Sequence, residues 1–195
     1  MRIAVYLGSS RGRDPKYMEA AQETGRRLAQ SGIGVVFGGA GVGTMKALSD
    51  GVAQAGGECI GVFPRGFKGK PEVAASGVNI HDCPVTREIL VKDFAERKAT
   101  MGELSDCCVA LPGSWGTLDE LFTYATETQL GFNGGKPLFV LNLDGYYDSL
   151  VSMVEKMYVE GFIYESSYHL LTFVPTVDAL IEKVTQYAAE MQTKK

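Results

Sequence analysis

Three short apolar runs in this chain are each followed by a glycine-rich turn and then by a helical pattern. The third run, at 107–111, reads Cys-Cys-Val-Ala-Leu, which is too short for a helix and typical of a buried parallel strand. After the turn at 112–117, apolar residues recur every three or four positions from 118 to 125, as on one face of a helix. The runs at 3–7 and 33–37 begin the same order of elements. A chain built this way belongs to the folds in which helices cover parallel strands.

The whole chain predicts strands that alternate with helices. We expect strands at 3–7, 33–37, 58–63, 78–82, 107–111, 137–143 and 170–174. We expect helices at about 15–30, 44–55 and 85–104, from the 112–117 turn to near 131, from 144–147 to 161, and at about 176–191. This alternation indicates a single Rossmann-like domain over residues 1–195, a doubly wound α/β fold with a mainly parallel sheet of about seven strands. The Gly-, Lys- and Pro-rich stretch at 64–76 is either a surface loop or a lid over a substrate site.

The glycine turns at 8–12, 38–44 and 112–117 each follow a predicted strand. In an open α/β sheet, ligands bind at the carboxyl edge of the strands, near the point where the strand order reverses, so the three turns could line one pocket. A glycine turn that leads into a helix presents free N–H groups at the positive end of the helix dipole, where phosphate binds. The backbone of the third turn, with the hydroxyls of Ser114 and Thr117, is our candidate phosphate cradle.

Glu120 is placed by the pattern in the first turn of the helix after the third glycine turn, facing the same crevice. In one interpretation Thr117 and Glu120 form a capping box, with Thr117 as N-cap and Glu120 at N3. In the other, Glu120 is a catalytic carboxylate that stabilises a positively charged transition state or orients a water molecule. This segment alone does not decide between them.

Composition narrows the function classes. The net charge of −4, without a long basic run, disfavours duplex nucleic acid as a partner and is compatible with a small phosphorylated ligand. No apolar run reaches transmembrane length, and the N-terminus reads as a strand and not as a signal peptide. Cys59, Cys83, Cys107 and Cys108 lack metal-ligand spacing, so we expect buried, reduced thiols, a cytoplasmic protein and no bound metal.

The chain lacks residues that familiar cofactor and hydrolase motifs require. A P-loop requires lysine after its last glycine, but Thr44 and Met45 follow the second glycine turn, so NTP hydrolysis is not expected. The turn at 8–12 reads Gly-Ser-Ser-Arg-Gly, which lacks the dinucleotide spacing, and we expect neither NAD nor FAD nor another cofactor. His81 and His169 lie outside any nucleophile elbow, so structural roles are predicted for both.

Several segments together resemble the Lonely Guy family of cytokinin riboside 5′-monophosphate phosphoribohydrolases, whose bacterial members were often labelled possible lysine decarboxylases. Residues 112–120 are similar to the family signature P-G-G-x-G-T-x-x-E, with Ser114 at the second glycine. Residues 96–101 are similar to its R-K-x-x-M helix, with Ala95 where the family usually has His. The turns at 8–12 and 38–44, together with 129–131 and 144–147, also match.

The resemblance implies hydrolysis of the N-glycosidic bond of AMP or an N6-modified AMP, with Arg97 and Glu120 as catalytic residues. The alternative is a nucleotide or molybdenum-cofactor carrier of the same superfamily that performs no chemistry. From spacing alone, Arg97 could instead form a surface ion pair with Asp93, four residues away on a helix. The family also implies a homodimer or larger homo-oligomer, with the active site near the subunit interface.

The expected substrate-binding residues come from the three glycine turns and the two helices that carry the family motifs. By pattern alone, Thr126 is an ordinary helix residue and Lys98 is either solvated or directed at the site. The full set is Gly8, Ser9, Gly38, Gly39, Lys98, Gly113, Ser114, Trp115, Gly116, Thr117, Asp119 and Thr126.

Overall fold

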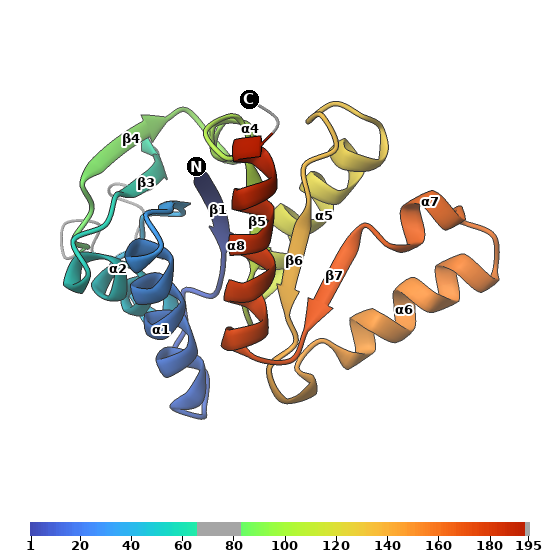
Figure 1. Ribbon diagram of the computed structural model, residues 1–195, viewed down its shortest axis with the longest axis horizontal. Helices are drawn as coiled ribbons and strands as arrows, with labels where there is room; N and C mark the ends of the chain where they lie inside the picture. The colour runs from blue at the N-terminus through green and yellow to red at the C-terminus, as the bar shows by residue number, and fades with distance from the viewer. Residues whose placement is uncertain (66–82, 194–195) are drawn as a thin grey trace.

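The computed structural model describes residues 1–65 and 83–193. Its strands form one sheet of seven parallel strands in the order β4-β3-β2-β1-β5-β6-β7 (Figure 1). They are β1 (Arg2–Tyr6), β2 (Gly34–Phe37), β3 (Cys59–Pro64), β4 (Arg87–Val91), β5 (Cys107–Ala110), β6 (Leu138–Leu141) and β7 (Leu171–Val174). The helices are α1 (Lys16–Gln30), α2 (Gly43–Gln54), α4 (Phe94–Glu103), α5 (Trp115–Gln129), α6 (Asp148–Val159), α7 (Glu165–Tyr168) and α8 (Val177–Thr193), with a 3₁₀ turn η3 (Leu143–Gly145).

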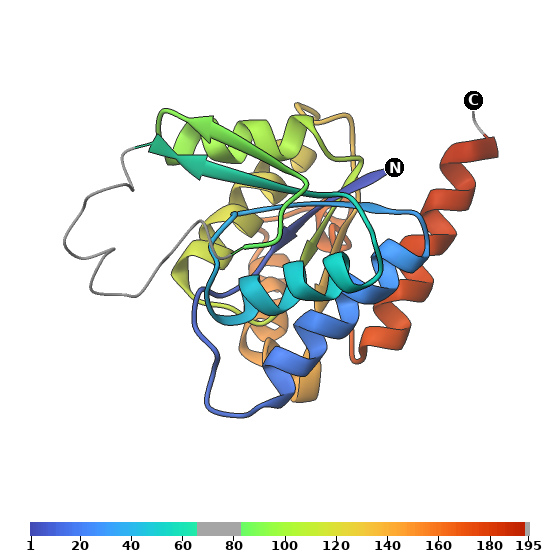
Figure 2. The same cartoon turned by 90° about the vertical axis from the view of Figure 1, so that its left-hand side faces the viewer.

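Helices cover both faces of the sheet. Figures 1 and 2 show α1, α2 and α8 on one side and α4 and α5 on the other. The side chains of β1 alternate accordingly, with Ile3 and Val5 in the first core and Ala4 and Tyr6 in the second. Because the central strands are buried on both faces, they read as continuous apolar runs, which is why the sequence predicts them well.

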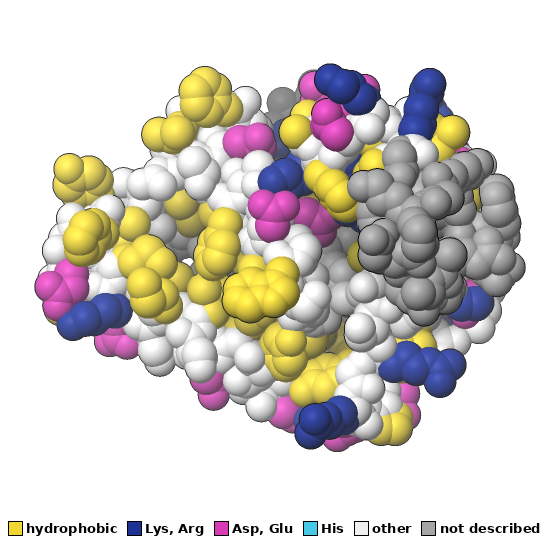
Figure 3. Space-filling view, turned by 180° about the vertical axis from the view of Figure 1, so that it is seen from behind, with side chains coloured by type: hydrophobic (Ala, Val, Ile, Leu, Met, Phe, Trp, Pro, Cys, Tyr) yellow, Lys and Arg dark blue, Asp and Glu magenta, His cyan; other side chains and the backbone are white. Residues whose placement is uncertain are grey.

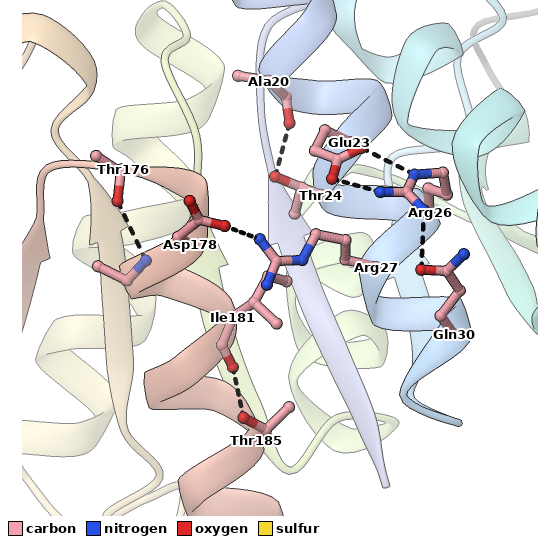
Figure 4. A network of polar contacts seen from close by, with 11 residues as sticks. Ala20, Glu23, Thr24, Arg26, Arg27, Gln30, Thr176, Asp178, Ile181 and Thr185 are labelled. Atoms are coloured by element: carbon pink, nitrogen blue, oxygen red, sulfur yellow. Dashed lines mark hydrogen bonds and ion pairs between the residues drawn. The ribbon is translucent and has the colours of Figure 1, made fainter.

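Helices α1 and α8 lie side by side on the first face and are joined at their surface by one ion pair (Figure 4). Arg27 of α1 forms an ion pair with Asp178 of α8. Thr176 caps α8, since its hydroxyl accepts a hydrogen bond from the N–H of Ala179 at 3.2 Å. Exposed ion pairs contribute little, so the docking of α8 rests mainly on buried residues such as Leu180.

The predicted fold class and the order of most elements are confirmed. The strand predicted at 78–82, His81 and most of the 64–76 loop lie outside the described residues. All four cysteines are buried and unpaired, as expected. His169 ends α7 and lies 3.4 Å from Glu165, a contact local to that helix. In the two described ranges, no helix is long and apolar enough to cross a membrane.

The helix predicted over 85–104 is wrong in its first half. Residues Arg87–Val91 form β4, which among the described residues pairs with β3 alone and is the edge of the sheet. Arg87 and Glu88 are exposed there, so the strand lacks the apolar run by which the central strands are recognised. The helix begins only after Asp93, whose carboxylate accepts a hydrogen bond from the N–H of Glu96 at 2.9 Å.

Candidate active site

The sheet order reverses between β1 and β5, and the glycine turns after these two strands lie on either side of that point. The hydroxyl of Thr44, which begins α2, donates to the carbonyl of Gly8 at 2.7 Å. A Cβ added to Gly8 would lie 3.5 Å from the Cα of Gly113. The three glycine turns are therefore in contact, as predicted. A cavity of about 120 Å³ lies between them, bordered by Gly8, Thr44, Gly113 and Ser114 among others.

Helix α5 starts earlier than the sequence pattern indicates. Its N-cap is Ser114, so Trp115, Gly116 and Thr117 form the first turn, and Glu120 is the sixth helical residue. The prediction of a capping box formed by Thr117 and Glu120 is therefore wrong, because neither residue occupies its required position. Ser114 makes no side-chain capping hydrogen bond, which leaves the first-turn N–H groups of α5 available to a ligand.

Thr117 has a buried hydroxyl that lacks a hydrogen-bond partner among the described residues. The hydroxyl packs against the turn, since a Cβ on Gly113 would lie 2.0 Å from Thr117 Oγ1. Only glycine fits at this position while Thr117 keeps its present place. A buried hydroxyl without a partner is unfavourable, and an acceptor oxygen from a ligand would satisfy it.

Arg97 of α4 and Glu120 of α5 form a buried ion pair. Arg97 Nη1 lies 2.9 Å from Glu120 Oε1, and the two side chains are 11% and 6% exposed. The distance is that of an ion pair, but the N–H does not align closely enough with Oε1 to make a hydrogen bond. The alternative prediction, a surface ion pair of Arg97 with Asp93, is wrong, because Asp93 caps α4 and Arg97 points inward.

Two features of the sheet hold Arg97 in place. Its Nε donates to the carbonyl of Val62 on β3 at 3.1 Å. The guanidinium lies directly over Gly38, where an added Cβ would be 1.7 Å from Arg97 Nη2. The second glycine turn therefore makes room for the arginine, a role that glycine content alone does not reveal.

Burial raises the pKa of Glu120 to about 7, while Arg97 acts in the opposite direction. Asp119, the preceding residue, raises the pKa of Glu120 further. A carboxylate with a pKa near neutrality both accepts and releases a proton readily at physiological pH.

The remaining predicted residues lie around this centre. Lys98 Nζ lies 2.9 and 3.0 Å from the two carboxylate oxygens of Asp119, and also donates to Thr123 Oγ1 at 2.9 Å. Trp115 is 86% exposed. Thr126 is exposed on α5, and its hydroxyl donates to the carbonyl of Phe122 within the helix at 2.8 Å.

Three residues near the cavity were not selected from the sequence: Thr44, Tyr17 and Tyr146. Thr44 was considered only as a failed P-loop position, although its hydroxyl joins two glycine turns. Tyr17 and Tyr146 border the cavity from α1 and from the turn after β6. For Tyr146 the available signal was an aromatic residue in the turn after the predicted strand at 137–143, at the edge where ligands bind.

Comparison with known proteins assigns the family. A family model described as "possible lysine decarboxylase" matches residues 45–184. "Cytokinin riboside 5'-monophosphate phosphoribohydrolase LOG" from Oryza sativa subsp. japonica is 38% identical over 191 residues, covering 98% of this chain and 75% of that protein. The chain belongs to the Lonely Guy family. The LOG3 phosphoribohydrolase of Arabidopsis thaliana is 36% identical over 187 residues, covering 96% and 83% of the two chains.

Solved structures extend the comparison of the fold beyond this family. A molybdenum cofactor binding protein from Rippkaea orientalis has a TM-score of 0.69 at 20% identity, with 96% of each chain covered. The Moco Carrier Protein of Chlamydomonas reinhardtii has a TM-score of 0.64 at 22% identity, covering 97% of this chain and 98% of that one. The Lonely Guy chain described here therefore shares its fold with these carriers.

The raised pKa of Glu120 predicts a specific pH dependence of stability. The folded state favours the protonated carboxyl, so this contribution is present in full below the ordinary value of 4.5 and is lost as pH rises through about 7. The free energy of unfolding of the wild type, relative to Glu120→Gln, should fall between pH 5 and pH 8, by up to about 3 kcal/mol. Urea unfolding at several pH values measures this difference.

Glu182→Gln removes one carboxylate from the exposed surface of α8 and is the matched control. Curves of stability against pH that run parallel for the wild type and Glu120→Gln would contradict this account of Glu120.

Proposed function

We propose that this protein hydrolyses the N-glycosidic bond of a nucleoside 5′-monophosphate, AMP or an N6-modified AMP, to the free base and ribose 5-phosphate. The observation that carries this proposal is the buried ion pair of Arg97 with Glu120, because Glu120 lies on the helix whose N-terminus offers an anion site. The two relatives described above are named cytokinin riboside 5′-monophosphate phosphoribohydrolases, which supports the same reaction.

The 5′-phosphate binds the glycine turns in this proposal. The first-turn N–H groups of α5 donate to it, and the hydroxyls of Ser114 and Thr117 assist. Thr117 brings independent support, because its buried hydroxyl lacks a partner in the part of the chain that the structure describes. Gly8, Ser9 and Gly39 complete the contact surface from the neighbouring turns.

Glu120 then acts at the anomeric carbon. It lies five residues beyond Trp115, which is about 7.5 Å along the helix axis and comparable to the reach of a ribose from its 5′-phosphate. Cleavage of the C1′–N bond leaves its electron pair on the base and positive charge on the ribose ring, which a nearby carboxylate stabilises. Water adds its oxygen to C1′ as Glu120 accepts the proton, which then passes to the base or to solvent.

Arg97 keeps Glu120 functional as a base. Without a cation beside it, a carboxylate buried to this degree would remain protonated at neutral pH. The guanidinium at 2.9 Å counteracts part of that effect and fixes the carboxylate in one place. Gly38 is required for this arrangement, since a side chain there would displace the arginine.

The alternative is a carrier that binds a nucleotide or molybdenum cofactor without chemistry. The shared fold is compatible with it, at identities of 20–22%. The ion pair next to the anion site favours hydrolysis, because a carrier has no need of a buried carboxylate whose pKa lies near neutrality. We place the protein in the cytoplasm, on the basis of four buried, unpaired cysteines.

The proposed phosphate cradle predicts a preference for phosphorylated substrates. The wild type should release adenine and ribose 5-phosphate from AMP, with kcat/KM at least about a hundredfold above that for adenosine, because two charge-assisted hydrogen bonds contribute about 3 kcal/mol or more. Chromatographic assay of the released base measures both rates. Equal rates would remove the role of the phosphate cradle, and tight binding of AMP without products would favour the carrier.

We also propose that the protein is a homodimer that pairs through the α5–α6 surface. Figure 3 shows hydrophobic side chains gathered over this side of the molecule. Trp115 and Phe132 are 86% and 81% exposed, and α6 contains no buried residue. Thr126 lies on the exposed side of α5. Pairing of two subunits through this surface would bring Thr126 toward a substrate.

Light scattering should therefore give about twice the 21.0 kDa chain mass at micromolar concentration. Phe122→Asp, which places a charge in the middle of this surface, should lower the mass toward that of the monomer and reduce turnover. A wild type that is fully active as a 21.0 kDa particle would refute the dimer.

A further inference from the structure

Two adjacent tyrosines hold the turn that carries the proposed phosphate cradle. The hydroxyl of Tyr146 donates to the carbonyl of Gly113 at 2.6 Å. The hydroxyl of Tyr147 donates to the carbonyl of Leu111 at 2.8 Å. Two carbonyls of the β5–α5 connection are thus fixed by one dipeptide from the turn that follows β6.

The turn that presents these tyrosines is itself strongly specified. The N–H of Tyr147 donates to Asn142 Oδ1 at 2.6 Å, and Asn142 Nδ2 donates to Asp148 Oδ1 at 2.8 Å. Asp144 and Gly145 have positive φ angles of 49° and 74°, and among non-glycine residues of the described chain Asp144 alone has such an angle. A backbone conformation of this kind persists only where surrounding contacts impose it.

Tyr146 also reaches the first helix. Its ring meets that of Tyr17 edge to face, with centroids 5.6 Å apart, and both residues border the small cavity. Lys16 Nζ lies 2.9 Å from Asp144 Oδ2, which joins the start of α1 to the same turn. Tyr146 is therefore held from two sides while its hydroxyl engages Gly113.

The hydrogen bond to Gly113 has a consequence for the cradle. The carbonyl of Gly113 and the N–H of Ser114 belong to one planar peptide group and point in opposite directions. Fixing the carbonyl therefore fixes the direction of that N–H. Without the hydroxyl, a peptide group that begins with glycine has a wide choice of orientations, and ordering it would oppose ligand binding.

We propose that Tyr146 is a positioning residue for the 5′-phosphate, holding the Gly113–Ser114 peptide in the orientation that binds phosphate. This inference rests on the proposed function in placing the phosphate at that turn. Tyr146 acts through the backbone and not on the reacting atoms. Its effect should fall on ligands that carry a phosphate and spare those that do not.

The test compares Tyr146→Phe with the wild type in calorimetric binding of ribose 5-phosphate and, separately, of adenosine. The substitution removes one hydroxyl and keeps the ring against Tyr17. We expect binding of ribose 5-phosphate to weaken about three- to tenfold, the range for one neutral hydrogen bond, and binding of adenosine to change less than about twofold. With AMP as substrate, KM should rise by the same factor while kcat stays within about twofold. Tyr187→Phe removes a hydroxyl that donates to the carbonyl of Asp106 at 3.3 Å, before β5 and therefore at the opposite edge of the sheet, and serves as the control.

Unchanged binding of ribose 5-phosphate by Tyr146→Phe would overturn the inference. Equal weakening of both ligands would also overturn it, because a general structural defect acts on both. A wild type that fails to bind ribose 5-phosphate would overturn both this inference and the phosphate cradle. A wild type that binds it but hydrolyses no nucleotide would overturn the proposed function alone.

Discussion

The buried Arg97–Glu120 pair is the interaction around which the carboxyl edge of the sheet is arranged. Charges removed from water are unfavourable unless each finds a partner, and here the partners come from four parts of the chain. Arg97 contacts Glu120 of α5 and the carbonyl of Val62, and lies over Gly38. Arg97 forms an ion pair with Glu120 but no aligned hydrogen bond, so burial still raises the pKa of Glu120 to about 7. Arg97 thus holds the Glu120 carboxyl in place, while that carboxyl still gains and loses a proton near neutral pH.

The sheet topology explains why the proposed anion site lies beside this pair. Reversal of strand order between β1 and β5 separates the helices that follow them and leaves the glycine turns of both strands open to a ligand. Glu120 lies on the helix whose N-terminus faces that opening. In the proposed reaction, one helix therefore provides both the positive end for a phosphate and the carboxylate for the reacting carbon, at a spacing set by helix geometry.

The parts of this arrangement that depend on local pattern were predictable. The run at 107–111 and the glycine turns identified the central strands and the binding edge, because burial on both faces leaves a continuous apolar signal. The edge strand Arg87–Val91 was missed because exposed charges hide that signal. Thr117 and Glu120 imitate a capping box, and only the start of α5 at Trp115 excludes it. The inward direction of Arg97 depends on Gly38, 59 positions earlier, and no local pattern records such a contact.

Turnover of AMP by Glu120→Gln tests whether Glu120 is the catalytic carboxylate. The substitution keeps the size of the side chain and removes the charge and the base. Glu127→Gln, two turns further along the same helix, is the control. With both variants folded and binding AMP, we predict that kcat falls at least about a hundredfold for Glu120→Gln and stays within about twofold for Glu127→Gln. A Glu120→Gln variant that binds AMP and turns it over within a fewfold of the wild type would show that this carboxylate is not the catalyst.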